Sequence, residues 1–369
     1  VREDYEKNKF GKASEEVCAD FTKAERLVAL NSPVMQIAMY TAMIIVSYVG
    51  AKLIINSGAS EMGVGALSSM FTYGMQILSS LMMLSMIFVM ITISNASIQR
   101  ICEVLNEEST IENPENPKTD VPDGSIDFNG VSFKYHADAE KNALTDINLH
   151  IRSGETIGII GGTGSSKSSL IQLISRLYDA TEGEVLVGGS NVKDYDIETL
   201  RSAVSVVLQK NVLFSGTIKE NLRWGDMNAT DEELVRVCKL AQADEFINTL
   251  PDGYDTHIEQ GGTNVSGGKK QRLCIARALL KKPKIIIFDD STSAVDTKTD
   301  ALIRNALATE IPDTTKIIIA QRISSVQDAD RVVVMEDGRI NAVGTHDELL
   351  ESNEIYKEVY YSQNKAGEE

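Results

Sequence analysis

The sequence predicts a chain of two parts: an α-helical hairpin long enough to cross a membrane, and after it an α/β domain with a largely parallel sheet. Two observations support this prediction. No charged residue occurs from Leu27 to Ala51 or from Met62 to Gln99. From residue 126 onward, short β-rich runs alternate with helical stretches, the order typical of α/β domains. With 43% hydrophobic and 24% charged residues among 369, the chain can bury a sizeable core.

The two uncharged runs predict transmembrane helices over residues 27–55 and 62–99. A bilayer core needs about 20 consecutive apolar residues, and both runs are long enough. The second run has 38 residues. As a helix it would be roughly 57 Å long at about 1.5 Å per residue, so we expect it to project into the cytoplasm. The polar segment 56–61 predicts a turn that folds the two helices into a hairpin.

Basic residues flank the far ends of this hairpin at Lys23, Arg26 and Arg100. Basic flanks mark the cytoplasmic side, so we expect both far ends there. The alternative is a buried hairpin of a soluble protein, but soluble helices of this length carry charges on an outer face. The first residue is valine and no cleavable signal precedes the first apolar run, so we expect the chain to begin inside a longer protein.

Charge and cysteine usage exclude some classes of partner. The formal net charge of -17, from 53 acidic and 36 basic residues, would repel a phosphate backbone, and no basic patch offsets it. We therefore expect no nucleic-acid partner. The four cysteines are far apart in the sequence and have no metal-ligand spacing, which fits a reducing compartment.

A domain boundary is predicted at residues 106–125. This segment has three prolines and six acidic residues against one lysine, the composition of an exposed connector. It separates a partial transmembrane domain, residues 1–105, from an α/β domain, residues 126–369. The predicted strands of that domain are Ile126–Phe133, Thr156–Ile160, Ser205–Leu208, Lys284–Phe288, Lys316–Ile319 and Arg331–Met335.

A phosphate-binding loop is predicted directly after the strand Thr156–Ile160. The order strand, glycine-rich loop, helix is the context of a P-loop. Backbone N–H groups would hold the phosphates, the Lys167 ammonium would neutralise the β and γ phosphates, and the Ser168 hydroxyl would ligate Mg²⁺. The nucleotide-binding residues predicted in this segment are Gly161, Gly162, Thr163, Gly164, Ser165, Ser166, Lys167, Ser168 and Ser169.

The loop departs from the usual GxxxxGK[ST] pattern at Ser166, where that pattern has glycine. Serine is small and compatible with the first turn of a helix, so we expect nucleotide binding to survive. A greatly improved nucleotide affinity in a Ser166→Gly variant would contradict this expectation.

Two carboxylates, Asp289 and Asp290, follow the apolar run Ile285–Phe288. A Mg²⁺ site needs such a ligand beside the P-loop, and the run is similar to a Walker B strand. An apolar strand that ends in two acids is common, so alone it would indicate only a core strand. The segment just upstream is more specific. Ser266, Gly267 and Gly268 open a helix, and an exposed helix N-terminus is a second phosphate-binding surface.

These motifs, in this order, resemble the ATP-binding cassette (ABC) family, in which the serine and two glycines form the signature that reaches the partner's P-loop across a dimer. The resemblance implies roles for three further residues. Tyr135 matches the aromatic residue that stacks on adenine, Gln209 matches the glutamine that contacts Mg²⁺ and couples to the membrane helices, and Asp296, in Ser293–Asp296, matches the D-loop. The order hairpin then cassette is that of exporters with six membrane helices per subunit, which leaves four outside this chain.

Two departures from the family bear on ATP hydrolysis. Asp290 stands where the family has a glutamate base, and its shorter side chain should position water poorly. Gln321 replaces the switch histidine and cannot carry charge. Catalysis is thus assigned to Asp290, Gln321 and Lys167, with ATP binding preserved and hydrolysis weakened. The pairing resembles the degenerate subunit of heterodimeric exporters, and a homodimer in which aspartate serves as the base is the alternative.

The leading interpretation is an ATP- and Mg²⁺-dependent exporter subunit, with Mg²⁺ held by Ser168, Gln209 and Asp289. It places the chain as a multi-pass protein in the plasma membrane, with the cassette in the cytoplasm and a second exporter subunit as partner. The cargo would be a small molecule, a lipid or a peptide. Two other interpretations are a soluble ABC ATPase that acts on nucleic acid or ribosomes, and a nucleotide-sensing regulatory subunit.

Overall fold

The computed structural model describes residues 2–58, 60, 62–136, 138–290 and 295–365. The chain divides into two compact units, residues 1–108 and residues 109–369. The first is a helical hairpin and the second is an α/β domain, so the fold class matches the prediction.

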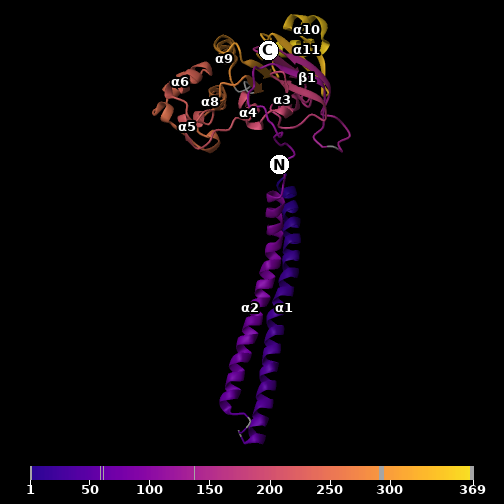
Figure 1. Cartoon of the computed structure of the whole chain (residues 1–369), viewed down its shortest axis with the longest axis vertical. Coiled ribbons are helices and arrows are strands. Elements are labelled where there is room, and N and C mark those ends of the chain that lie inside the picture. Colours follow the sequence, from indigo (N-terminus) through magenta and orange to yellow (C-terminus); the bar gives the residue numbers. More distant parts are fainter. Residues whose placement is uncertain (1, 59, 61, 137, 291–294, 366–369) are drawn as a thin grey trace. The chain divides into compact units, whose positions relative to one another are not determined.

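The hairpin consists of α1 (Glu3–Ser57) and α2 (Val64–Leu105), which run antiparallel and side by side (Figure 1). Both are long and apolar enough to cross a membrane. They contact each other through a hydrogen bond from Asn31 Nδ2 to Ser85 Oγ (3.0 Å). Gly50 allows a close approach, because a Cβ there would lie 2.4 Å from a methyl carbon of Leu67. Helix α1 extends beyond both ends of the predicted span 27–55, whereas α2 begins two residues inside the predicted span 62–99 and extends beyond its end.

The α/β unit is built around a six-stranded sheet of order β12-β11-β3-β10-β9-β6. Every neighbouring pair in it is parallel except β11 and β12. Its strands are β3 (Thr156–Gly161), β6 (Val204–Val207), β9 (Ile285–Asp289), β10 (Thr315–Ile319), β11 (Arg331–Glu336) and β12 (Arg339–Gly344).

Both faces of this sheet are covered by apolar residues, which explains why its strands read as unbroken hydrophobic runs. In β9, Ile285 and Ile287 face one core, while Ile286 and Phe288 face the other. The first core lies against an antiparallel sheet of order β2-β1-β4-β5, with β1 (Ile126–Phe133), β2 (Leu144–Ile151), β4 (Glu182–Val187) and β5 (Ser190–Asn191).

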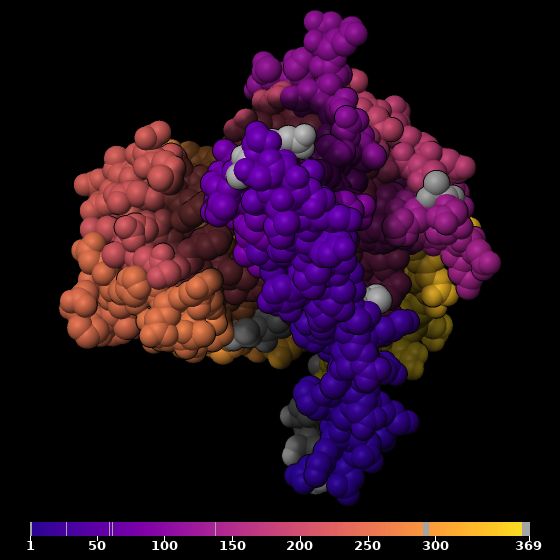
Figure 2. Space-filling view, turned by 90° about the horizontal axis from the view of Figure 1, so that it is seen from below, coloured from indigo at the N-terminus to yellow at the C-terminus, as the bar shows by residue number. Residues whose placement is uncertain are grey.

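The second core lies under a helical lobe, which comprises α5 to α8 and the loops between them. Figures 1 and 2 show this lobe in salmon and orange on one side of the α/β unit, and the pink antiparallel sheet on the other. The helices of the unit are α3 (Lys167–Ile174), α4 (Ile197–Ala203), α5 (Ile218–Arg223), α6 (Asp231–Leu240), α7 (Asp244–Asn248), α8 (Gly267–Leu280), α9 (Thr297–Glu310), α10 (His346–Ser352) and α11 (Glu354–Lys365). The short strands β7 (Gly216–Thr217) and β8 (His257–Ile258) pair with each other.

The six predicted strands are present to within about a residue or two at each end. The first of them, β1, belongs to the antiparallel sheet and not to the parallel one. Strands β2, β4 and β12 were not predicted. The connector predicted at 106–125 also differs from a free linker, because residues 109–125 belong to the second unit and Val121 is buried in its core.

Candidate nucleotide-binding site

The carboxyl ends of four parallel strands bring the predicted site residues together. The P-loop follows β3, Gln209 follows β6, Asp290 follows β9 and Gln321 follows β10. Since neighbouring parallel strands end at the same edge, loops from distant parts of the sequence meet there, the usual ligand position in α/β sheets.

The P-loop folds tightly around the Lys167 side chain. Its ammonium donates hydrogen bonds to the carbonyl oxygens of Gly161 (2.8 Å) and Gly162 (2.9 Å) and to Ser165 Oγ (3.2 Å). Burial lowers the pKa of Lys167 from its ordinary value, while Asp289 and Asp290 act to raise it. Gly161 has no room for a side chain, because a Cβ there would lie 2.4 Å from the carbonyl oxygen of Met335.

Ser166 lies outside the helix that follows the loop. Helix α3 begins at Lys167, and Ser166 is its N-cap, with φ 66° and ψ 26° in the left-handed region. The expectation that Ser166 would fit the first helical turn is therefore wrong. The left-handed backbone explains why the usual pattern has glycine here, since glycine adopts positive φ without a Cβ clash.

Replacing Ser166 by glycine should stabilise the fold. The left-handed conformation costs a non-glycine residue roughly 1–2 kcal/mol, and the extra flexibility of unfolded glycine offsets about 0.5–1 kcal/mol of that. We expect the free energy of unfolding to rise by about 0.5–1 kcal/mol, measured by denaturant titration with the fluorescence of the single tryptophan, Trp224. Ser165→Gly is the control and should destabilise, because Ser165 is buried and contacts Lys167. A less stable Ser166→Gly variant would contradict the strain argument.

Ser168 and Asp289 form a corner suited to Mg²⁺. The Ser168 hydroxyl donates to Asp289 Oδ2 at 3.2 Å. Burial raises the pKa of Asp289, and the charge of Asp290 adds to this rise. A cation bound here would reverse both effects. Among the residues that the structure describes, no three His, Cys, Asp or Glu side chains could hold a metal ion together. The hydroxyl of Ser168 and the carboxylate of Asp289 fit Mg²⁺, which binds through few protein oxygens plus substrate phosphates.

The third predicted Mg²⁺ ligand, Gln209, lies beside Asp290, and its contact with Mg²⁺ stays a prediction. Gln209 Nε2 donates to Asp290 Oδ2 at 3.1 Å, and Gln321 Nε2 donates to the same oxygen at 2.8 Å. The backbone of Asp290 has a positive φ of 47°, and its N–H donates to the carbonyl oxygen of Ile319. The two residues that depart from the ABC pattern, Asp290 and Gln321, are thus in direct contact.

Tyr135 presents an exposed ring next to the P-loop helix. Its hydroxyl lies 2.8 Å from Ser169 Oγ and donates to Gln172 Oε1 at 3.2 Å, both on α3. The ring packs edge-on against Phe133 and Tyr178. An exposed aromatic ring can stack on a base, and stacking of Tyr135 on adenine stays a prediction.

The signature residues open helix α8. Ser266 is its N-cap, and Gly267 and Gly268 form its first turn. Ser266 and Gly267 are exposed, which leaves the helix N-terminus accessible. Lys269, where the family has glutamine, lies over the ring of Phe246, its Nζ 5.3 Å from the centroid.

Asp296 begins α9, and its side chain accepts a hydrogen bond from Thr299 N at 2.9 Å. That backbone contact is the first cause of its lowered pKa. Ser293 and Ala294, two other predicted D-loop positions, lie outside the described residues, while Val295 is buried.

Sequence reasoning missed Gln363, on the C-terminal helix α11. Gln363 Nε2 donates to the carbonyl oxygen of Gln321 at 2.7 Å, and its Oε1 accepts from Ile323 N at 2.9 Å. This side chain therefore fixes the backbone on both sides of Arg322. Nothing in a polar C-terminal helix indicates such a contact before the fold is known.

The fold and this site define a P-loop nucleotide-binding domain attached to a hairpin of membrane-spanning length. Residues 144–293 match the family model described as ABC transporter. This match shows that residues 144–293 form an ABC transporter domain.

The chain is similar to two curated proteins and to one solved structure over nearly all of its length. An uncharacterised ABC transporter ATP-binding protein of Mycobacterium tuberculosis is 40% identical over 368 residues, 98% of this chain and 62% of that protein. The ABC transporter ATP-binding protein YfiB of Bacillus subtilis is 39% identical, with the same two coverages. A solved bacterial Atm1-family ABC exporter with ATP bound has a TM-score of 0.86 and 30% identity, over 98% of this chain and 63% of that one. The chain thus spans less than two thirds of these relatives.

Proposed function

We propose that the chain is the ATP-binding and ATP-hydrolysing part of a membrane exporter subunit, and the weak-hydrolysis partner of a heterodimer. It lies in the plasma membrane with the cassette in the cytoplasm, and its partner is a second exporter subunit. Closure of two cassettes on ATP would shift the membrane helices between inward- and outward-open states. The cargo is a small molecule, a lipid or a peptide.

The residues of the site divide the work of nucleotide binding. Tyr135 stacks on adenine, and the loop N–H groups hold the phosphates. Lys167 transfers its hydrogen bonds from the Gly161 and Gly162 carbonyls to phosphate oxygens. Ser168 and Asp289 would hold Mg²⁺, which would supply charge neutralisation on the transferred phosphate.

Weak hydrolysis is inferred from one observation, the double hydrogen bond that Asp290 Oδ2 accepts from Gln209 and Gln321. A general base must accept a proton from water at a free oxygen within about 2.6–3.2 Å. Two amide donors already bind this oxygen and compete with water for it. Displacing each of these hydrogen bonds would cost roughly 1 kcal/mol. Neither amide can accept or release a proton during hydrolysis, whereas a histidine at position 321 could.

The experiment that tests this proposal is steady-state ATP hydrolysis by the subunit purified alone into lipid nanodiscs. Enzymes have a median turnover of about 10 per second. We expect this subunit to be at least about a hundredfold slower, although it is saturated with MgATP. Rapid turnover by the subunit alone would favour the homodimer, in which Asp290 is a competent base. Recovery of the protein in the aqueous phase of a detergent partition would favour the soluble ATPase.

A further inference from the structure

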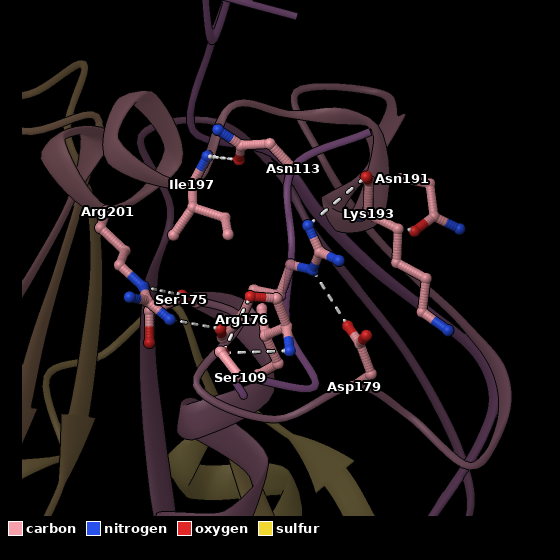
Figure 3. Close-up of polar contacts among 10 residues, drawn as sticks. Ser109, Asn113, Ser175, Arg176, Asp179, Asn191, Lys193, Ile197 and Arg201 are labelled. Carbon is pink, nitrogen blue, oxygen red and sulfur yellow. Dashed lines mark hydrogen bonds and ion pairs between the residues drawn. The ribbon is translucent and has the colours of Figure 1, made fainter. Parts of the chain in front are cut away.

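The predicted connector is fastened to the short helix α4. Ile197 N donates to Asn113 Oδ1 at 2.8 Å (Figure 3). Asn113 Nδ2 also donates to Asp196 Oδ1 at 2.7 Å. The second oxygen of Asp196 accepts from Thr199 N at 2.9 Å. The N-terminus of α4 is therefore capped twice, once by its own Asp196 and once by a connector residue.

The connector is held a second time a few residues later. Lys118 N donates to the carbonyl oxygen of Asp194 at 2.8 Å, and Asp196 N donates to the carbonyl oxygen of Lys118 at 2.9 Å. The Lys118 ammonium also donates to Ser190 Oγ at 2.9 Å. The segment that leads from α2 into the cassette thus cannot move without displacing the start of α4.

The other end of α4 is tied to the P-loop helix. Arg201 Nη2 donates to the carbonyl oxygen of Arg176 at 2.8 Å, and its Nε donates to that of Ser175 at 3.3 Å. Figure 3 shows the Arg201 guanidinium directed at these two carbonyls, which directly follow α3. A guanidinium placed there also interacts favourably with the negative end of the helix dipole.

Arg176 also lies between the end of α3 and the segment before α4. Its side chain is buried, its φ is 50°, and its Nε donates to Asp179 Oδ1 at 3.0 Å. Its Nη1 lies 3.5 Å from the carbonyl oxygen of Lys193, just before α4. The end of α3 and the segment just before α4 are thereby linked by the buried Arg176 side chain as well as by Arg201.

Helix α4 also contacts the end of the signature helix and leads into the Gln209 loop. Lys281, the C-cap of α8, donates from Nζ to the carbonyl oxygen of Arg201 at 3.2 Å. The helix ends at Ala203, and β6 then runs directly toward Gln209. The C-terminal end of the P-loop helix, the end of the signature helix and the strand that leads to Gln209 therefore all adjoin α4.

We propose that α4 relays nucleotide occupancy of the P-loop to the connector, with Asn113 and Arg201 as its two positioning residues. The relay rests on the nucleotide binding proposed above. Helix α3 is about 12 Å long, at about 1.5 Å per residue, and moves as one rigid unit. It shifts when phosphate draws Lys167 away from the loop carbonyls. Arg201 carries that shift to α4, and Asn113 carries it to the connector that continues into α2.

Hydrogen exchange of the chain in nanodiscs, with and without MgATP, tests the relay. In the wild type we expect nucleotide to slow exchange at least threefold in two places, the P-loop and residues 109–118. In Arg201→Ala we expect the Kd for ATP to stay within about threefold and the P-loop protection to remain, while the response of residues 109–118 is lost. Asn113→Ala, a substitution at an exposed side chain, should reduce that response from the opposite end of α4, because only the backbone contacts of Lys118 then hold the connector.

Lys193→Ala is the matched control. Its side chain is exposed and points away from the cluster in Figure 3, and the substitution keeps the carbonyl that Arg176 contacts, so the connector should respond as in the wild type. A connector that responds fully in Arg201→Ala or Asn113→Ala would overturn the relay. The relay would also be overturned if, in the wild type, MgATP slowed hydrogen exchange in the P-loop but not in residues 109–118. No protection anywhere would instead overturn the nucleotide binding on which the relay rests.

Discussion

Replacing Lys167 by alanine should weaken MgATP binding at least about a hundredfold. Its ammonium already lies within 2.8–3.2 Å of three oxygens of the P-loop, at the place where phosphate oxygens would compete for it. Hydrogen bonds to charged groups contribute about 1.5–3 kcal/mol each, and two such bonds correspond to a factor of about 10² to 10⁴ in Kd. Isothermal titration of the purified protein with MgATP measures the change.

The control for this prediction is Lys193→Ala, which removes the same charge from an exposed site and should leave Kd unchanged. Unfolding must be checked by circular dichroism, because Lys167 also donates three hydrogen bonds within the loop. A folded Lys167→Ala protein with less than a fivefold change in Kd would show that the triphosphate does not sit in this loop.

The double substitution Asp290→Glu with Gln321→His should raise the rate of ATP hydrolysis by at least about tenfold, measured in the assembled pair of subunits. Glutamate extends the carboxylate by one methylene toward the water, and histidine removes one of the two amide donors to Asp290 Oδ2. A positioned base contributes about 10² to 10⁴ in rate, so partial recovery of its geometry should be easy to detect.

Each single substitution should recover less than the double one, because the two side chains are in contact and their effects should not be additive. The pair Asp290→Asn with Gln321→His is the matched control, since it supplies the histidine without a base. An unchanged rate in the Glu/His variant, with Kd for ATP also unchanged, would mean that these two residues do not limit turnover.

Much of the site could be predicted because its motifs are local in sequence. Gly161 to Ser169 form one loop, and Asp289 and Asp290 end one strand, so their spacing alone indicates neighbouring positions. The apolar run from Ile285 to Phe288 likewise identified a strand buried on both faces. Tyr135 was placed beside the P-loop by the family resemblance, and the structure puts its hydroxyl against α3.

The features that were missed depend on long-range contacts or on backbone conformation. The left-handed φ of Ser166 is invisible in a pattern that treats serine as a small helical residue. Asn113 binds a helix end 84 residues away, so its composition-based assignment to an exposed connector was reasonable but incomplete. Strands β2 and β4 have mixed polar sequences because only one face of their antiparallel sheet is buried, and no simple hydrophobic run indicates them.

The most direct measurement for the central claim is the chemical state of nucleotide held by the subunit. The protein in nanodiscs is loaded with radiolabelled MgATP, freed of excess nucleotide after several minutes, and its bound nucleotide is separated by chromatography. A P-loop site that binds ATP but lacks a competent base should retain about one nucleotide per chain, most of it still ATP. Bound nucleotide recovered almost entirely as ADP, or no bound nucleotide at all, would contradict this account.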